Sequence, residues 1–170
     1  MQVLSLQNLI SMHSLEKPGS VSQEKKRYFE NLNVGEKFSS RWLSLSIEEM
    51  IKFASEFDPQ YFHIDPDEAQ KSPFGEIVAS GTHTFAVWNK LNLEVNGNIA
   101  WIAGLGFNDF KFPNPLRAGI SIQSTSHLLS KRDSDSDANR GLVIHEYRVI
   151  DKDELSIFEC TCPALVQKTP

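Results

Sequence analysis

A carboxylate and an imidazole stand five residues apart in the middle of the chain, at Asp58 and His63. Pro59 pushes the residue before it out of the helical region, so the sequence predicts a loop here, directly after a helix. Side chains at this spacing on a loop can converge on one small volume. Both groups can accept a proton from a shared water molecule, so the pair predicts general acid–base chemistry.

A second candidate for chemistry is Gly81, which closes the stretch Ile-Val-Ala-Ser-Gly at 77–81. An apolar helix is predicted to begin at this point, and the first N–H groups of a helix lack partners inside it. These donors and the helix dipole favour negative charge that develops on a nearby oxygen. Because glycine has no side chain, a substrate carbonyl can approach closely. We therefore expect the Gly81 N–H to bind an oxyanion.

Each of these residues also has a structural interpretation. Asp58 alone is typical of a turn before proline, His63 alone is typical of a buried structural histidine, and Gly81 alone can permit a tight turn. The joint spacing of Asp58 and His63, between a helix end and the 77–81 stretch, favours catalysis. Asp65 is best explained as the N-cap of a short helix that begins at Pro66.

The remaining histidines and cysteines predict no further chemistry. No partner stands at metal-ligand spacing from the histidines, so we expect no metal site. These histidines are His83, His127 and His145. The two cysteines, Cys160 and Cys162, are too close for a disulfide framework and alternate with Thr161. They are therefore expected to be reduced, buried thiols on one face of a strand.

Hydrophobic periodicity predicts the elements that position the candidate residues. Ser46 and Glu49 form a capping box, and the helix that follows must stop at Phe57, before Pro59. The segment 82–95 is apolar on more than one side, so it predicts a helix inside the domain, wrapped by a sheet. The later strands follow one another in the chain, which implies an antiparallel sheet and an α+β fold. The predicted strands are 38–45, 99–112, 119–131, 141–151 and 155–167.

Length and composition predict one globular domain. The 170 residues are 40% hydrophobic and 23% charged, which are ordinary globular values. Residues 1–24 lack sustained periodicity and predict a flexible arm, so we place the domain at 25–170. A net charge of −5 argues against a nucleic-acid partner. The opening residues lack the features of a signal peptide, and no segment is apolar enough for a membrane span, so we expect a cytoplasmic protein.

From Tyr28-Phe29-Glu30, through the segment of Asp58 and His63, to Pro115–Gly119, the chain resembles the MaoC-like acyl dehydratases, which include the R-specific enoyl-CoA hydratases. The likeness covers residues 28–167. It is strongest in the motif in which four residues separate Asp58 from His63. The resemblance implies a hotdog fold, in which an antiparallel β-sheet wraps around a central α-helix. It also implies a homodimer or higher homo-oligomer, with thioester substrates bound at or near the subunit interface.

The same resemblance assigns roles to residues. Asp58 and His63 match the catalytic pair, and Gly81 matches the residue whose N–H holds the thioester carbonyl. Ser80 and Asp65 match positions that line or support such a site. The implied reaction is reversible hydration of a 2-enoyl thioester of CoA or an acyl carrier. Water between the pair loses a proton as its oxygen attacks Cβ, charge moves to the thioester oxygen, and a proton returns to Cα. No metal or organic cofactor is required.

Two departures and two alternatives accompany this hypothesis. Gln60 and Tyr61 stand where many relatives have asparagine and proline, and their larger side chains could reshape the acyl pocket. One alternative function is thioester hydrolysis, because hotdog proteins share one architecture across chemistries. The other is an acyl-thioester-binding module without turnover. The presence of both Asp58 and His63 favours hydration, while acyl length, branching and carrier stay open.

Overall fold

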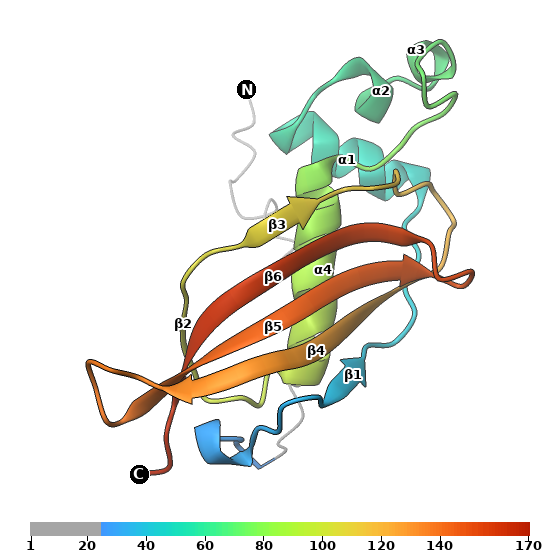
Figure 1. Ribbon diagram of the computed structural model, residues 1–170. Coiled ribbons are helices and arrows are strands. Elements are labelled where there is room, and N and C mark those ends of the chain that lie inside the picture. Colours follow the sequence, from blue (N-terminus) through green and yellow to red (C-terminus); the bar gives the residue numbers. More distant parts are fainter. Residues whose placement is uncertain (1–24) are drawn as a thin grey trace, which may run out of the picture.

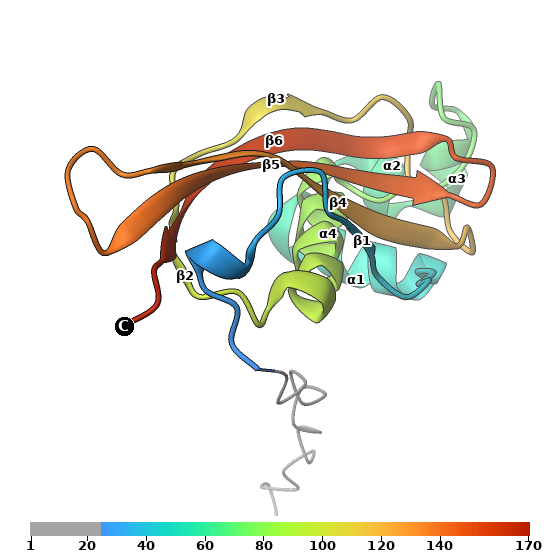
Figure 2. The same cartoon turned by 60° about the horizontal axis from the view of Figure 1, so that its bottom comes forward.

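Residues 25–170 are described by the computed structural model, so the arm predicted at 1–24 lies outside the described residues. Six strands form one antiparallel sheet in the order β1-β4-β5-β6-β2, and β3 also pairs with β6. The strands are β1 (Lys37–Ser39), β2 (Trp101–Gly104), β3 (Asn108–Lys111), β4 (Ile122–Asp133), β5 (Arg140–Asp151) and β6 (Ser156–Gln167). The long helix α4 (Gly81–Asn96) crosses the concave face of this sheet (Figure 1, Figure 2). The predicted antiparallel sheet around a central helix is confirmed.

The hydrophobic core lies between α4 and the inner face of the sheet. Buried and partly exposed side chains alternate along β4, β5 and β6, as expected for strands with one face on a core. Trp88 of α4 packs with its ring centroid 5.0 Å from that of Tyr147 and 5.4 Å from that of Phe158. These contacts fix α4 against β5 and β6, and thereby fix the position at which α4 begins.

The cysteines of β6 are free and buried on this inner face, as predicted. Burial raises the pKa of the Cys160 thiol to about 12 and also raises the pKa of Cys162. His145 lies opposite Cys162 on β5 and is buried as well, and burial lowers its pKa to about 4. At neutral pH all three side chains are therefore uncharged, which suits a core and leaves the thiols unreactive.

Two predicted strands differ from the structure. The first, predicted at 38–45, is limited to β1, followed by a single bridge between Leu43 and Ile122. The strand predicted at 99–112 is divided into β2 and β3. Gly106 between them has φ of 150°, a conformation that residues other than glycine rarely adopt. The regular hydrogen bonding of a strand is therefore interrupted there. The other three strands are confirmed with small shifts of their ends.

The helices follow their predicted signals, with two additions, one of which is the short 3-10 helix Phe29–Asn31. Helix α1 (Ile47–Phe57) begins at the predicted capping box, in which the Glu49 N–H donates to Ser46 Oγ and the Ser46 N–H donates to the Glu49 carboxylate. Helix α3 (Pro66–Gln70) begins after Asp65, which caps it as predicted. The segment before it is not a continuous loop, because α2 (Tyr61–Ile64) forms one helical turn there. A single turn is too short for a periodic pattern, so the sequence did not predict it.

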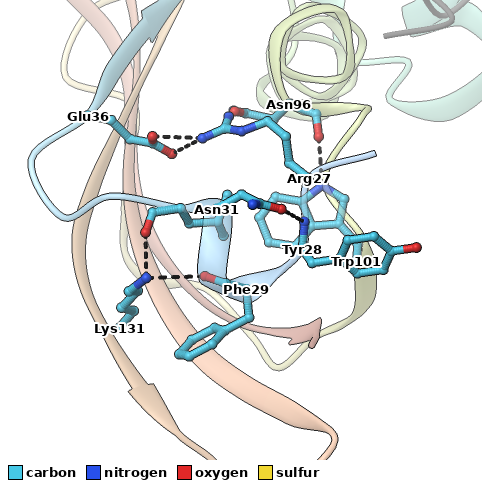
Figure 3. A network of polar contacts seen from close by, with 9 residues as sticks. Arg27, Tyr28, Phe29, Asn31, Glu36, Asn96, Trp101 and Lys131 are labelled. Carbon is cyan, nitrogen blue, oxygen red and sulfur yellow. Dashed lines mark hydrogen bonds and ion pairs between the residues drawn. The ribbon is translucent and has the colours of Figure 1, made fainter. Parts of the chain in front are cut away.

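A network of polar contacts attaches the first described residues to the domain (Figure 3). The Arg27 guanidinium binds both carboxylate oxygens of Glu36, at 2.6 and 2.7 Å. Lys131 Nζ on β4 donates to the carbonyl oxygens of Phe29 and Leu32, at 3.2 and 2.5 Å. The Phe29 ring also packs over the start of β5. This segment therefore belongs to the folded body of the protein.

Replacing Gly141 with alanine is expected to destabilise the domain. A Cβ at Gly141 would lie 2.2 to 2.5 Å from three atoms of the Phe29 ring, which is far inside van der Waals contact. Relief requires a shift of the ring, at about 1–3 kcal/mol of unfolding free energy. Gly104→Ala is the matched control, because its nearest neighbour would be Cys162 Sγ at 3.9 Å. Urea denaturation of both variants checks this, and equal midpoints would contradict the packing described.

Candidate active site

Asp58 is held at the C-terminal end of α1. Its N–H donates to the carbonyl of Ala54 at 2.8 Å, which closes the last helical turn, and Pro59 then directs the chain away. One carboxylate oxygen, Oδ1, accepts a hydrogen bond from the Gln60 side-chain amide at 2.9 Å. The side chain is 22% exposed. Asp58 is therefore oriented by its neighbours, and its side chain is still partly exposed to solvent.

His63 is fixed by a backbone carbonyl fifteen residues away. Its Nδ1 lies 2.7 Å from the carbonyl oxygen of Val78, and its side chain is 7% exposed. A carbonyl oxygen only accepts hydrogen bonds, so Nδ1 carries the hydrogen. In the neutral ring Nε2 is then unprotonated and can act as an acceptor or a base. This one hydrogen bond therefore selects the tautomer that carries its hydrogen on Nδ1.

The structure brings the two predicted residues together. His63 Nε2 lies 3.8 Å from Asp58 Oδ2, so both side chains point into the same small region. This distance exceeds that of a direct hydrogen bond. One water molecule placed beside both atoms can donate a hydrogen bond to each of them. The two atoms are therefore close enough to bind the same water molecule.

Helix α4 begins at Gly81, close to the predicted start. Ser80 is its N-cap: the hydroxyl accepts from the His83 N–H at 3.1 Å and is hydrogen-bonded to the Thr82 hydroxyl at 2.9 Å. Ser80 is 1% exposed, so its hydroxyl is occupied in capping. Among the contacts of residues 25–170, none pairs the Gly81 N–H. This N–H is an available donor at the positive end of a sixteen-residue helix.

The catalytic candidates and the start of α4 are joined by backbone contacts. His63 donates to the Val78 carbonyl, and the Val78 N–H donates in turn to the Phe62 carbonyl at 3.4 Å. Gly81 is three positions after Val78 in the chain, which limits their Cα separation to about 10 Å. Figure 1 shows α1 and α2 at the end of the sheet where α4 begins. Asp58, His63 and Gly81 therefore lie in one region of the fold.

Asp65 stands at the edge of this region and has a structural task. Its carboxylate accepts from the N–H groups of Asp67 and Glu68, at 3.0 and 3.1 Å, which confirms it as the N-cap of α3.

The sequence analysis did not predict two other groups that hold the site residues. The Gln60 amide that holds Asp58 had a signal in its i+2 spacing. The Val78 carbonyl that holds His63 had none, because backbone acceptors have no sequence signature.

A groove lies between α1 and α4, and neither Asp58 nor His63 is among the residues that line it. It has a volume of about 390 Å³ and is lined by Phe53, Phe57, His83 and Val87, among others. The His83 ring stacks on Phe53 with 4.2 Å between centroids, and burial lowers its pKa. His83 is thus a neutral, buried side chain, in agreement with its predicted structural role. No cluster of three metal-binding side chains exists within residues 25–170.

Comparisons with known proteins identify a family to which this chain is similar. The family model for the MaoC like domain matches residues 29–148. The uncharacterized protein YdeM of Bacillus subtilis (strain 168) is 28% identical over 141 residues, which cover 82% of this chain and 98% of YdeM. The 3-hydroxyacyl-thioester dehydratase Z of Mycobacterium tuberculosis (strain ATCC 25618 / H37Rv) is 34% identical over 104 residues, covering 58% of this chain and 68% of that protein.

Solved structures extend the comparison to the fold. The MaoC-like dehydratase from Rhodospirillum rubrum superposes with a TM-score of 0.80 and 30% identity, covering 85% of this chain and 99% of that chain. A Mycobacterium tuberculosis protein with a double hotdog fold superposes with a TM-score of 0.67 and 16% identity, over 85% of this chain and 45% of that chain. The predicted hotdog fold is confirmed. None of the helices in residues 25–170 combines the length and apolar character that a membrane crossing needs.

Proposed function

This chain belongs to the MaoC-like domain family, and from that premise we propose that it catalyses the reversible hydration of 2-enoyl thioesters to 3-hydroxyacyl thioesters. The observation that carries the proposal is the approach of His63 Nε2 to Asp58 Oδ2 at 3.8 Å, with the tautomer of His63 set by Val78. Such a pair, with one unprotonated nitrogen and one carboxylate oxygen facing the same space, suits activation of water.

In the hydration direction the pair binds one water molecule. The water donates one hydrogen bond to His63 Nε2 and one to Asp58 Oδ2. As its oxygen attacks Cβ, a proton passes to the pair and the C=C electrons move toward the thioester. The resulting enolate takes up a proton at Cα, and the pair supplies one proton to balance the one it accepted. Dehydration runs through the same steps in reverse.

The Gly81 N–H binds the thioester oxygen during this step. Negative charge develops on that oxygen when Cβ is attacked, and an oriented backbone donor stabilises it. Loss of one such donor typically costs about 3 kcal/mol of transition-state stabilisation. Ser80 supports this role indirectly, because its cap fixes the first turn of α4 and the direction of the free N–H groups. Asp65 positions α3 and is assigned no contact with substrate.

A two-readout assay tests the proposed function. The purified protein is incubated with crotonyl-CoA and longer 2-enoyl-CoA thioesters, while the absorbance of the conjugated thioester and the release of free thiol are followed together. Hydration removes the absorbance and releases no thiol. Thiol release would support a hotdog thioesterase instead. No change with any chain length would favour a thioester-binding module without turnover.

The proposal includes a homodimer, joined at the edge of the sheet formed by β2 and β3. Within the described chain β3 has a partner strand on one side only, β6. Large apolar side chains are exposed along this edge, which is unusual for a free strand edge. They are Ile102, Leu105, Phe107 and Phe110, each between 43% and 55% exposed. A second copy paired at β3 would cover them and continue the sheet.

Replacing Phe110 with lysine is expected to separate this dimer. A charge on an edge strand opposes pairing with another strand, and burying it in an apolar interface is costly. The variant should migrate as a single chain of 19.2 kDa where the native protein has twice that mass. Leu155→Lys is the control, because Leu155 is equally exposed but lies in the turn between β5 and β6. Light scattering after gel filtration measures both, and a dimeric Phe110→Lys protein would exclude this edge.

A further inference from the structure

The Phe112 ring lies directly against Gly81. A Cβ at Gly81 would be 3.1 Å from Cε2 and 3.2 Å from Cζ of Phe112, so the ring occupies the space beside the glycine. Cα–Cβ bonds of a helix tilt toward its N-terminus. The ring is therefore displaced toward the start of α4, where the first N–H groups point. Phe112 thus flanks the space in front of the Gly81 donor.

The ring is held in this position by other aromatic side chains. Its centroid lies 5.2 Å from that of Phe110, in an edge-to-face arrangement, and 5.5 Å from that of Phe158. Phe158 is fully buried and packs against Trp88 in the core. Pro113 follows Phe112 and restricts its backbone. These contacts limit movement of the Phe112 ring away from Gly81.

The same ring is also open to a ligand. Phe112 is 43% exposed although it contacts Gly81 on one side and Phe158 on another. A thioester whose oxygen accepts from the Gly81 N–H places its carbonyl carbon about 4 Å from that nitrogen. The atoms attached to that carbon then fall within van der Waals reach of the ring. A flat conjugated enoyl group can lie along an aromatic face, whereas a branch beside the carbonyl needs the space that the ring fills.

From this geometry we propose that Phe112 determines substrate specificity by excluding branches at Cα, so that the enzyme prefers unbranched 2-enoyl thioesters. This inference rests on the proposed hydratase function, because it places the thioester oxygen at Gly81. Phe112 contacts the acyl group without taking part in proton transfer. Its effect is a difference in kcat/KM between two substrates that differ by one methyl group.

Comparison of crotonyl-CoA with 2-methylcrotonyl-CoA tests the inference. Phe112→Ala is expected to raise kcat/KM for the branched substrate relative to crotonyl-CoA by about tenfold or more, within the range that one methyl group produces in a pocket. Trp42→Ala is the matched control, because Trp42 is a similarly exposed aromatic residue that follows β1, at the opposite edge of the sheet, and its substrate ratio should be that of the native protein. Phe112→Leu is the second variant, for the case that the alanine protein does not fold.

Gly81→Ala supplies an independent readout of the same contact. Alanine keeps the backbone N–H but adds a methyl group against the ring, so kcat/KM for crotonyl-CoA should fall. In the Phe112→Ala protein the same substitution should cost several-fold less, because the obstructing ring is absent. An active enzyme whose substrate ratio is unchanged by Phe112→Ala and Phe112→Leu would overturn the inference. A folded native protein without activity would refute the proposed function itself, and the assignment of Phe112 with it.

Discussion

Replacing His63 with alanine is expected to lower kcat/KM for crotonyl-CoA hydration by about 10²- to 10⁴-fold, the usual contribution of a general base. The substitution removes Nε2, which faces Asp58 Oδ2 across 3.8 Å and is one of the two acceptors proposed for the water. It also removes the hydrogen bond to the Val78 carbonyl. Steady-state kinetics followed by the absorbance of the conjugated thioester measure the loss.

His63→Asn separates the chemical role of His63 from its structural role. The asparagine Nδ2 can take the place of the imidazole Nδ1 and donate to the Val78 carbonyl, but asparagine has no group where Nε2 lies. We expect this variant to be more stable than His63→Ala and equally inactive. Recovery of native activity in His63→Asn would show that the imidazole only holds α2 in place, and would contradict its assignment as a base.

Asp58→Asn is expected to reduce kcat/KM by about 10²-fold or more, with little change in the free energy of unfolding. Asparagine has the same size, and its carbonyl oxygen can still accept from the Gln60 amide. The amino group that replaces Oδ2 can only donate, so the water loses one of its two acceptors. Kinetics and thermal unfolding of the same preparation give the two quantities.

Glu56→Gln is the matched control for Asp58→Asn. Glu56 is an exposed carboxylate on the last turn of α1, two residues before Asp58, and lines the groove between α1 and α4. Its loss changes the local charge by the same amount without removing an acceptor that faces His63. We expect native kcat/KM in Glu56→Gln. A similar loss of activity in both variants would mean that net charge near α1, rather than the Asp58 oxygen, supports the reaction.

The sequence was sufficient to predict the elements whose boundaries have local causes. Helix α1 begins at the Ser46 capping box and ends before Pro59, and both signals lie within a few residues of the effect. Helix α4 was predicted from apolar residues on several of its sides. The division of 99–112 at Gly106 was not predicted, because a lone glycine within a strand pattern is compatible with an unbroken strand, a bulge or a break.

Prediction of the site had a similar limit. The spacing of Asp58 and His63 predicted that they would converge, and the structure confirms this. The Val78 carbonyl that sets the tautomer of His63 could not be predicted, since it depends on how α2 packs against the segment before α4. The contact between Phe112 and Gly81 joins the segment after β3 to α4 through tertiary packing alone. Local patterns contain no information about such contacts.

A double-substitution cycle tests most directly whether Asp58 and His63 act on one shared water. Kinetics of crotonyl-CoA hydration are measured for the native protein, Asp58→Asn, His63→Asn and the doubly substituted protein. If the two groups act as a unit, the double variant will be only a few-fold slower than the slower single variant. Losses that multiply would show that the two side chains contribute independently, and would contradict the shared water.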